Sequence, residues 1–413
     1  MELDLSRAKI AIIGLGYVGL PLAVEFGKKF TTTGFDISHE RVAQLQSGND
    51  ATLECSPEEL KETTQLTYTA NKKDLKACNI YIVTVPTPID EHKQPDLSPL
   101  IKASEMLGSL INNGDIIIYE STVYPGATEE TCIPEVERVS GLKFNQDFFA
   151  GYSPERINPG DKEHRVTNIL KVTSGSTPEV AEIVDQLYKS IITAGTHKAS
   201  SIKVAEASKV IENVQRDVNI ALINELHQVF VRLNISTKEV IEAAATKWNF
   251  MKLQPGLVGG HCIGVDPYYL LHKSQKSGYI PDLMRKAREV NDNMPAYIAQ
   301  DFLTKLIKKK INPVDCKVGM LGFTFKENCP DIRNTKAYDL YDALSALGLE
   351  VKVIDPWANK EEVKAEYSLD IANQFNPEDV DVMLLTVGHE ELIRECVLLK
   401  EKKYIYDFKG LLD

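Results

Sequence analysis

Hydrophobic and polar positions change their period along this chain, and the changes predict alternating strands and helices. Two short runs, Lys9–Ile13 and Thr31–Ile37, are typical of strands, and the apolar residues of Tyr17–Phe26 between them recur at helical spacing. The alternation continues through a strand, a helix and a strand: Asn79–Val85, Leu97–Leu110 and Asp115–Tyr119. Strands and helices in this succession predict a parallel, doubly wound sheet.

A much longer helix is predicted at Ser200–Leu233, where helical spacing runs on without a proline or glycine. Its length far exceeds the average helix of about 11 residues. Helices this long usually bridge domains or build a dimer interface, although the pattern alone is equally compatible with a helix that is merely buried.

After Pro313 the first pattern returns. Three later runs resemble three early ones: Lys317–Gly322 resembles Lys9–Gly14, Leu349–Asp355 resembles Thr33–Asp36, and Asp381–Val387 resembles Asn79–Val85. The sequence therefore predicts an α/β fold with two Rossmann-like doubly wound domains joined by a long central helix. We expect domains at residues 1–198, 199–305 and 306–413. The second sheet lacks a complete glycine fingerprint, so it should hold a different ligand from the first.

Composition narrows the class of protein. The 413 residues carry a net charge of -12, which offers no basic face to nucleic acid. The seven cysteines are scattered without a Cys-x-x-Cys pair, which argues against a disulfide framework and against structural zinc. The N-terminus lacks a basic, apolar leader, and no run approaches the ~18 apolar residues of a membrane span. We expect a cytoplasmic protein with neither a nucleic-acid nor a membrane partner.

The run Gly14-Leu15-Gly16-Tyr17-Val18-Gly19 follows the first predicted strand and opens a helix, with Asp36 at the end of the next strand. In this context the glycines are a strong dinucleotide-binding signal: the first allows a tight turn, the second admits the pyrophosphate, and the third permits close helix–strand contact. Asp36 would bind the ribose hydroxyls and repel a 2′-phosphate. The sequence therefore predicts NAD as the cofactor.

Two loops follow other strands of the same predicted sheet, at the edge where ligands dock in open α/β folds. One contains Pro86 and Thr87, and the other begins with Ser121 and Thr122. Each could be an ordinary turn, but their shared position favours ligand contact.

Two pairs of polar residues are weaker signals. Glu155 stands next to Arg156 in a loop rich in glycine and proline, and Lys209 lies one helical turn before Asn213 on the long helix. Taken alone, each pattern favours solvated side chains over a functional site.

Cys262 lies in the run Gly259-Gly260-His261-Cys262-Ile263-Gly264-Val265-Asp266-Pro267. Flanking glycines suit close approach of the backbone to a ligand better than core packing. With a dinucleotide site, such a thiol could trap an aldehyde as a thiohemiacetal and carry it through a thioester to an acid. The alternative is a buried structural cysteine. His261 need not face its neighbour, and the run offers too few ligands for a metal.

Taken together and in order, these motifs resemble the UDP-glucose/GDP-mannose dehydrogenase family over essentially the whole chain. The resemblance also includes Ala205–Asn213 and the segment Gly322–Lys326 with Asp331 and Arg333. It implies a homodimer built on the long helix and a product that serves surface polysaccharide synthesis.

The resemblance assigns roles residue by residue. Cys262 would be the nucleophile, Lys209 and Asp266 would handle the alcohol proton and stabilise oxyanions, and Glu155 would assist thioester hydrolysis. Asn213 would be a further hydrogen-bond donor, and Thr122 would position water or the base. Arg41 would contact the cofactor. The substrate contacts would be Arg156, Gly259, Lys326 and Arg333.

The substrate branch follows from two departures. The UDP-glucose branch usually carries lysines at the positions of Glu120 and Val265. The surrounding motifs resemble the branch that oxidises UDP-N-acetylamino sugars, so we expect UDP-N-acetylglucosamine or UDP-N-acetylgalactosamine. UDP-N-acetylmannosamine stays as an alternative, because residue chemistry alone does not distinguish the epimers of the acetylated sugar. UDP-glucose is a further alternative.

Two other functions compete with this one. A two-electron hydroxyacid dehydrogenase also combines a Rossmann domain with long helices, but it leaves Cys262 and the second sheet without a role. A non-catalytic NAD-binding regulator does not account for Lys209, Asn213 and Asp266.

The first prediction concerns cofactor choice. Because a carboxylate at Asp36 opposes a 2′-phosphate, kcat/KM for NAD should exceed that for NADP by well over an order of magnitude. Steady-state kinetics with both cofactors measure this ratio. Equal use of the two would show that Asp36 points elsewhere.

Overall fold

The structure is a computed structural model that describes residues 5–90, 92–156, 165–260 and 263–412. The chain divides into two compact units. The N-terminal unit holds Met1–Glu212 and Tyr268–Ser277, and the C-terminal unit holds Asn213–Pro267 and Gly278–Asp413. Within the described part of the chain, no helix combines the length and the apolar character needed to cross a membrane.

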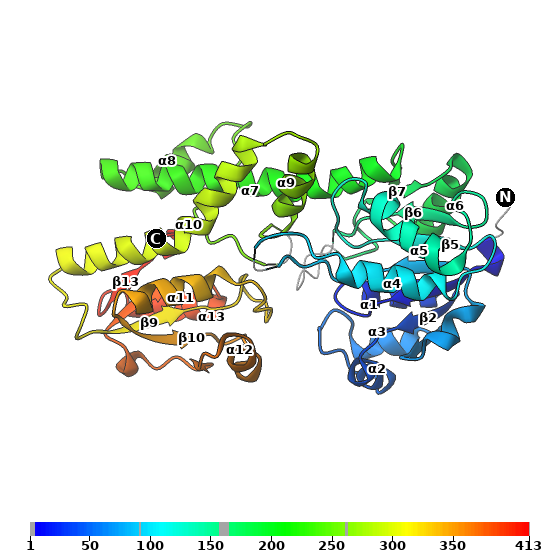
Figure 1. Ribbon diagram of the computed structural model, residues 1–413. Helices are drawn as coiled ribbons and strands as arrows, with labels where there is room; N and C mark the ends of the chain where they lie inside the picture. The colour runs from blue at the N-terminus through cyan, green and yellow to red at the C-terminus, as the bar shows by residue number, and fades with distance from the viewer. Residues whose placement is uncertain (1–4, 91, 157–164, 261–262, 413) are drawn as a thin grey trace. The chain divides into compact units, whose positions relative to one another are not determined.

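The N-terminal unit contains a sheet in the order β3-β2-β1-β4-β5-β6-β7-β8, parallel throughout except between β6 and β7 (Figure 1). The strands are β1 (Lys9–Ile13), β2 (Thr31–Phe35), β3 (Leu66–Thr69), β4 (Ile80–Val83), β5 (Ile116–Tyr119), β6 (Phe149–Tyr152), β7 (Lys171–Gly175) and β8 (Thr196–Lys198). The chain order reverses between β1 and β4, which is where ligands dock in such sheets.

Central strands of this sheet are buried on both faces, as parallel sheets require. Ile10, Ile12, Ile80 and Ile82 contribute to one hydrophobic core together with apolar side chains of α1 and α6. Helices α4 and α5 lie side by side (Figure 1). The helices are α1 (Gly19–Gly27), α2 (His39–Gln46), α3 (Pro57–Glu62), α4 (Ser98–Gly108), α5 (Ile133–Ser140) and α6 (Pro178–Lys189).

The C-terminal unit repeats this topology with the parallel order β11-β10-β9-β12-β13. Its strands are β9 (Lys317–Leu321), β10 (Glu350–Ile354), β11 (Ile371–Ala372), β12 (Val382–Leu385) and β13 (Tyr404–Tyr406). Because the order matches that of β3-β2-β1-β4-β5, the predicted second Rossmann-like sheet is confirmed. Its helices are α11 (Lys336–Ala346), α12 (Lys360–Tyr367) and α13 (Glu390–Leu399).

Four helices lie between the sheets in chain order: α7 (Ile202–Leu233), α8 (Thr237–Ala244), α9 (Asp266–Lys276) and α10 (Asp282–Lys308). Helix α7 confirms the predicted long helix and contributes residues to both units. Helix α10 continues through Pro295, which the sequence pattern did not anticipate, and packs along α11 (Figure 1). Whether the chain is best divided at residues 198 and 305 stays a prediction.

Glu206 fixes the start of α7 within the N-terminal unit. Its buried carboxylate accepts hydrogen bonds from the backbone N–H groups of Gly126 (2.5 Å) and Thr128 (2.9 Å). Burial raises the pKa of Glu206 to about 7, although these hydrogen bonds oppose the shift. The contact holds the first turns of the helix, and hence Lys209 one turn later, beside the loop that follows β5.

Candidate active site

The glycine loop after β1 has the geometry that the fingerprint predicts. Gly14 has a φ of +97°, which only glycine adopts without strain. A Cβ on Gly19 would lie 1.8 Å from the carbonyl oxygen of Gly14, so α1 begins in direct contact with the loop. A Cβ on Gly16 would meet nothing within 4 Å, which leaves that side of the loop open for a ligand.

Asp36 and Arg41 flank this loop. The Asp36 carboxylate accepts hydrogen bonds from the backbone N–H groups of Leu15 and Ser38, both at 2.9 Å. Arg41 donates from Nε to the Leu15 carbonyl oxygen (2.9 Å) and forms an ion pair with Asp50 (2.8 Å). Its Nη1 is buried and has no partner among the described residues. A carboxylate with remaining acceptor capacity beside an unused donor fits the ribose of the expected NAD.

The two predicted strand-end loops meet at the same edge, because β4 and β5 are neighbours. Ser121 donates a hydrogen bond from Oγ to the carbonyl oxygen of Val85 at 2.5 Å. Pro86 is exposed, whereas Thr87 and Thr122 are half-buried. The structure therefore brings these segments together, and their contact with a cofactor stays a prediction.

Glu155 belongs to a buried charged cluster rather than to a surface ion pair. Its carboxylate forms an ion pair with Lys171 on β7, and Lys171 also contacts the Glu120 carboxylate at 2.8 Å. Glu120 in turn accepts a hydrogen bond from the Tyr188 hydroxyl on α6. These four side chains are at most 6 % exposed. We call Glu120, Glu155, Lys171 and Tyr188 the carboxylate–lysine cluster.

Burial and charge act in opposite directions inside this cluster. Burial raises the pKa of Glu120 to about 7, even though Lys171 lowers it. Burial alone would lower the pKa of Lys171, but the carboxylates of Glu120 and Glu155 outweigh it and raise the pKa. Lys171 therefore stays charged inside the protein.

The two positions that the resemblance used to choose the substrate branch, Glu120 and Val265, are both buried. Glu120 is 3 % exposed and its carboxylate is committed to Lys171 and Tyr188. Val265 is 2 % exposed. Neither position offers a free side chain to a ligand, so any effect on substrate choice is exerted through neighbouring groups.

Arg156 does not pair with the Glu155 side chain, as its position in the sequence suggested. Its Nε contacts the Glu212 carboxylate on α7 at 2.9 Å, and only its backbone N–H donates to Glu155, at 2.6 Å. The ion pair with Glu212 is partly exposed, which leaves Arg156 accessible.

The polar residues predicted on α7 are buried, contrary to what charged helix positions usually do. Lys209 is 5 % exposed and Asn213, one turn later, is 0 % exposed. The side-chain amide of Asn213 donates a hydrogen bond to the carboxylate of Asp266, which opens α9. This pairing joins two predicted site residues 53 positions apart in the sequence.

Cys262 and His261 lie outside the described residues, but the glycines before them do not. A Cβ on Gly259 would lie 2.5 Å from the carbonyl oxygen of Asn334, and a Cβ on Gly260 would lie 2.7 Å from the Phe325 ring. The backbone N–H of Gly260 donates to the same Asn334 carbonyl oxygen at 3.1 Å. These glycines are therefore required for close packing against the segment Phe325–Asn334 of the C-terminal unit.

That segment carries Lys326 and Arg333, the predicted substrate contacts. The guanidinium of Arg333 binds both oxygens of Asp331, at 2.8 and 2.6 Å, and its side chain remains 39 % exposed. Lys326 is half-buried. A bidentate partner restrains the Arg333 guanidinium while leaving it accessible, an arrangement suited to binding phosphate oxygens.

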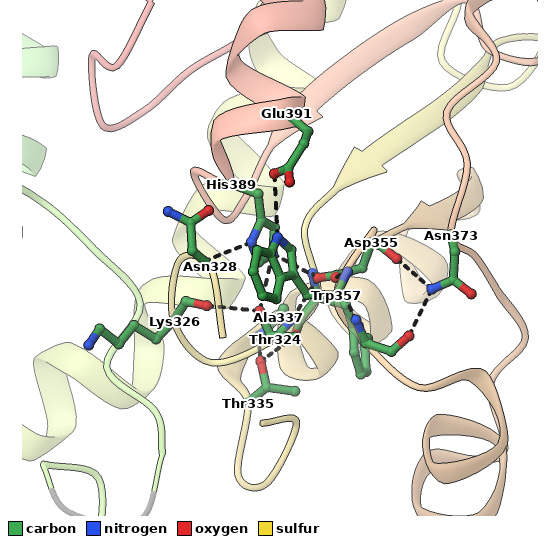
Figure 2. Close-up of polar contacts among 12 residues, drawn as sticks. Thr324, Lys326, Asn328, Thr335, Ala337, Asp355, Trp357, Asn373, His389 and Glu391 are labelled. Carbon is green, nitrogen blue, oxygen red and sulfur yellow. Dashed lines mark hydrogen bonds and ion pairs between the residues drawn. The ribbon is translucent and has the colours of Figure 1, made fainter. Parts of the chain in front are cut away.

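The second sheet uses the acid at the end of β10 differently from the first (Figure 2). Asp355 is 0 % exposed. It accepts hydrogen bonds from His389 and from four backbone N–H groups, those of Phe323, Thr324, Trp357 and Ala358. Burial alone would raise the pKa of Asp355, but these donors lower it. A saturated carboxylate cannot bind a ribose, in agreement with the expectation of a different ligand.

Sequence reasoning missed Lys171, Tyr188 and the role of Glu120. Lys171 begins an ordinary strand-like run, and no motif links it to Glu155, 16 residues earlier. Only the pairing of β6 with β7 brings them together.

Comparison with known proteins agrees with this architecture. Residues 8–192 match the model of the NAD binding domain of the UDP-glucose/GDP-mannose dehydrogenase family, residues 203–293 its central domain, and residues 319–413 its UDP binding domain. Among solved structures, a UDP-D-ManNAc dehydrogenase from Pyrococcus horikoshii superposes with a TM-score of 0.87 at 29 % identity. That alignment covers 98 % of this chain and 96 % of the other.

Two curated relatives are similar over nearly their whole length. The chain is 58 % identical to a UDP-N-acetyl-D-glucosamine 6-dehydrogenase of Pseudomonas aeruginosa, with 98 % of this chain and 97 % of the relative covered. It is 54 % identical to the protein of the same name from Salmonella typhi, with 99 % and 97 % covered. The chain belongs to the UDP-glucose/GDP-mannose dehydrogenase family.

Proposed function

We propose that this protein is a cytoplasmic, NAD-dependent UDP-N-acetyl-D-glucosamine 6-dehydrogenase that supplies a UDP-sugar acid for surface polysaccharide synthesis. The observation that carries the proposal is the full-length similarity to two relatives of that name, at 58 % and 54 % identity. The relatives named for UDP-N-acetyl-D-mannosamine are about half as similar, at 30–32 % identity. N-acetylglucosamine is therefore favoured among the epimers that the sequence left open.

Two NAD molecules, bound one after the other, would supply the oxidising capacity, each for one hydride from C6 of the sugar: the first at the alcohol and the second at the thiohemiacetal. In the glycine loop, Gly16 and the half-buried Tyr17 and Val18 would line the pyrophosphate site, and Asp36 with Arg41 would hold the ribose. Pro86, Thr87 and Ser121 would contact the cofactor from the neighbouring strand ends.

The chain's own residues would handle the protons and the carbon–sulfur bond. Asp266 and Lys209 would take the alcohol proton as the first hydride leaves, and the Cys262 thiolate would then add to the aldehyde carbon. Loss of a second hydride from the thiohemiacetal gives a thioester. Lys209 and the Asn213 amide would then donate to each oxyanion; a donor that is fixed before the reaction typically contributes about 3–4 kcal/mol.

Hydrolysis would complete the reaction. Water attacks the thioester carbonyl carbon while Glu155 accepts its proton and Thr122 positions it. The carbon–sulfur bond then breaks, Cys262 leaves as a thiolate, and the sugar acid is released. Lys326, Arg333 and Arg156 would hold the anionic substrate, with Gly259 as a further contact.

The outer face of α7 supports a homodimer. Val204, Ile211, Leu222, Val229 and Leu233 are each 43–59 % exposed. At 3.6 residues per turn their spacing places all five on one stripe of the helix. A stripe of large apolar side chains on a soluble protein marks an interaction surface. A second copy of the same helix would cover it symmetrically.

Dimerisation can be tested with a charge in the middle of this stripe. The native protein should run as a dimer of 46.1 kDa chains in light scattering, and Leu222→Glu should shift it toward monomer because a carboxylate would be buried without a partner. Leu398→Glu, at a side chain that is 71 % exposed on α13, is the matched control and should remain dimeric. A native monomer at micromolar concentration would contradict the proposal.

The stoichiometry of the reaction tests the four-electron mechanism. Each sugar oxidised should yield two NADH and one acid. Cys262→Ser should stop acid formation, because an alkoxide hemiacetal does not lead to a good acyl intermediate. Absorbance of NADH and quantitation of the acid by mass spectrometry give the ratio. One NADH per sugar, or full activity of the serine variant, would exclude the mechanism.

Substrate choice provides an independent test. Turnover of UDP-N-acetylglucosamine should clearly exceed that of UDP-glucose at equal concentration, because a site built for the acetamido group leaves polar groups unpaired when a hydroxyl binds. A panel that also contains UDP-N-acetylgalactosamine and UDP-N-acetylmannosamine ranks the epimers. Faster oxidation of UDP-glucose than of the acetylated sugars would refute the substrate assignment.

A further inference from the structure

We propose that Lys171 is a positioning residue that orients the Glu155 carboxylate and keeps it charged for the hydrolytic step, with Glu120 and Tyr188 holding Lys171 in place. This inference rests on the proposed function, because it assigns Glu155 to proton transfer from water. It adds Lys171 and Tyr188, which no motif of the sequence indicated, and it gives Glu120 a role beyond marking the substrate branch.

The reversal of β7 explains how a lysine reaches Glu155. In an all-parallel sheet the first residue of a strand lies at the edge opposite the ligand-binding loops. Strand β7 runs antiparallel to β6, so its first residue, Lys171, lies beside the loop that leaves β6. The hydroxyl of Ser153 donates to the Val172 carbonyl oxygen at 2.8 Å and continues this pairing toward Glu155.

Both oxygens of Glu155 are held. Oε1 accepts the backbone N–H of Arg156 at 2.6 Å, and Oε2 accepts from the Lys171 ammonium. Each oxygen of a carboxylate has more than one acceptor site, so one can still take a proton from water. The contacts restrict the rotation of the side chain, which is what a general base needs.

Lys171 is itself fixed from the other side. Glu120 contacts its ammonium at 2.8 Å, and the ammonium lies 5.3 Å from the centre of the Tyr188 ring. Glu120 and Tyr188 are joined by a hydrogen bond, so neither can turn away without leaving a buried polar group unpaired.

The positive charge of Lys171 compensates the negative charges of the Glu120 and Glu155 carboxylates. Without its ammonium, the carboxylates of Glu120 and Glu155 would share a buried site in which the described residues provide no other counter-ion, and like charges favour protonation. Within the part of the chain that the structure describes, the groups facing Glu155 are Lys171, Glu120 and Tyr188 from the neighbouring elements, and the Arg156 backbone from its own loop. The Arg156 side chain is paired with Glu212. A protonated Glu155 cannot accept a proton from water.

The test is Lys171→Met, which keeps the length of the side chain and removes its charge. Acid formation should slow at least ten-fold at neutral pH while formation of the first NADH changes far less, and intact-protein mass spectrometry should detect an accumulated sugar adduct. The acidic limb of the kcat–pH profile should move to higher pH. Lys171→Arg should restore most of the rate. Equal slowing of both phases with an unmoved pH profile would show that Lys171 is only structural.

Two further variants keep the inference testable if Lys171→Met does not fold. Glu120→Gln removes the competing negative charge, so the acidic limb should move to lower pH; no shift, or a shift upward, would overturn the inference. Lys198→Met removes an exposed lysine from the neighbouring strand β8 and should leave the profile unchanged. A ratio of two NADH per acid in the native enzyme tests the proposed function separately. Failure of the proposed function is therefore distinguishable from failure of this inference.

Discussion

Parallel strands leave their carboxyl ends at one edge of a sheet, and this constraint governs where chemistry occurs in the N-terminal unit. The glycine loop follows β1, Asp36 follows β2, and the loops with Thr87 and Thr122 follow β4 and β5. Hydrogen-bonded neighbours such as β4 and β5 then place residues that are far apart in sequence side by side. The antiparallel pairing of β7 with β6 adds Lys171, a residue that an all-parallel sheet would have placed elsewhere.

The two sheets show how one topology serves two purposes. In both, an acidic residue ends the second strand and accepts backbone N–H groups from the loop after the first strand. Asp36 accepts one such bond from Leu15 and a second from Ser38 in its own loop, and it keeps capacity for a ribose beside the unused Nη1 of Arg41. Five donors occupy the acceptor sites of the Asp355 carboxylate (Figure 2). Asp355 therefore fixes the loop that carries Lys326 instead of binding a ligand.

Burying charged groups costs free energy, and the N-terminal unit buries three of them in the carboxylate–lysine cluster. The desolvation penalty of Lys171 is offset only if Glu120 and Glu155 are both in place to contact it. Even then, a buried ion pair is rarely more stabilising than apolar packing. Such an arrangement is therefore better explained by chemistry than by stability. The same holds for Asn213 and Asp266 in the C-terminal unit, where an amide and a carboxylate are paired at almost complete burial.

The sequence by itself determined the two sheets, the long helix and the glycine loop, because period, glycine placement and the acid at a strand end are local properties of the chain. Strand and helix limits shifted by only a few residues, as at Ile116–Tyr119 and Ile202–Leu233. The sequence also indicated Glu155, Lys209 and Asp266 as site residues, although through resemblance to a family rather than through physical reasoning.

The tertiary structure alone decided which groups surround those residues. The sequence paired Glu155 with adjacent Arg156, whereas the fold pairs it with Lys171, and it left Glu120 as a mark of substrate branch, whereas the fold buries it against Tyr188. Neither contact has a local signature. Both depend on the direction of β7 and on the packing of α6, which are set by long-range strand pairing and by the shared hydrophobic core.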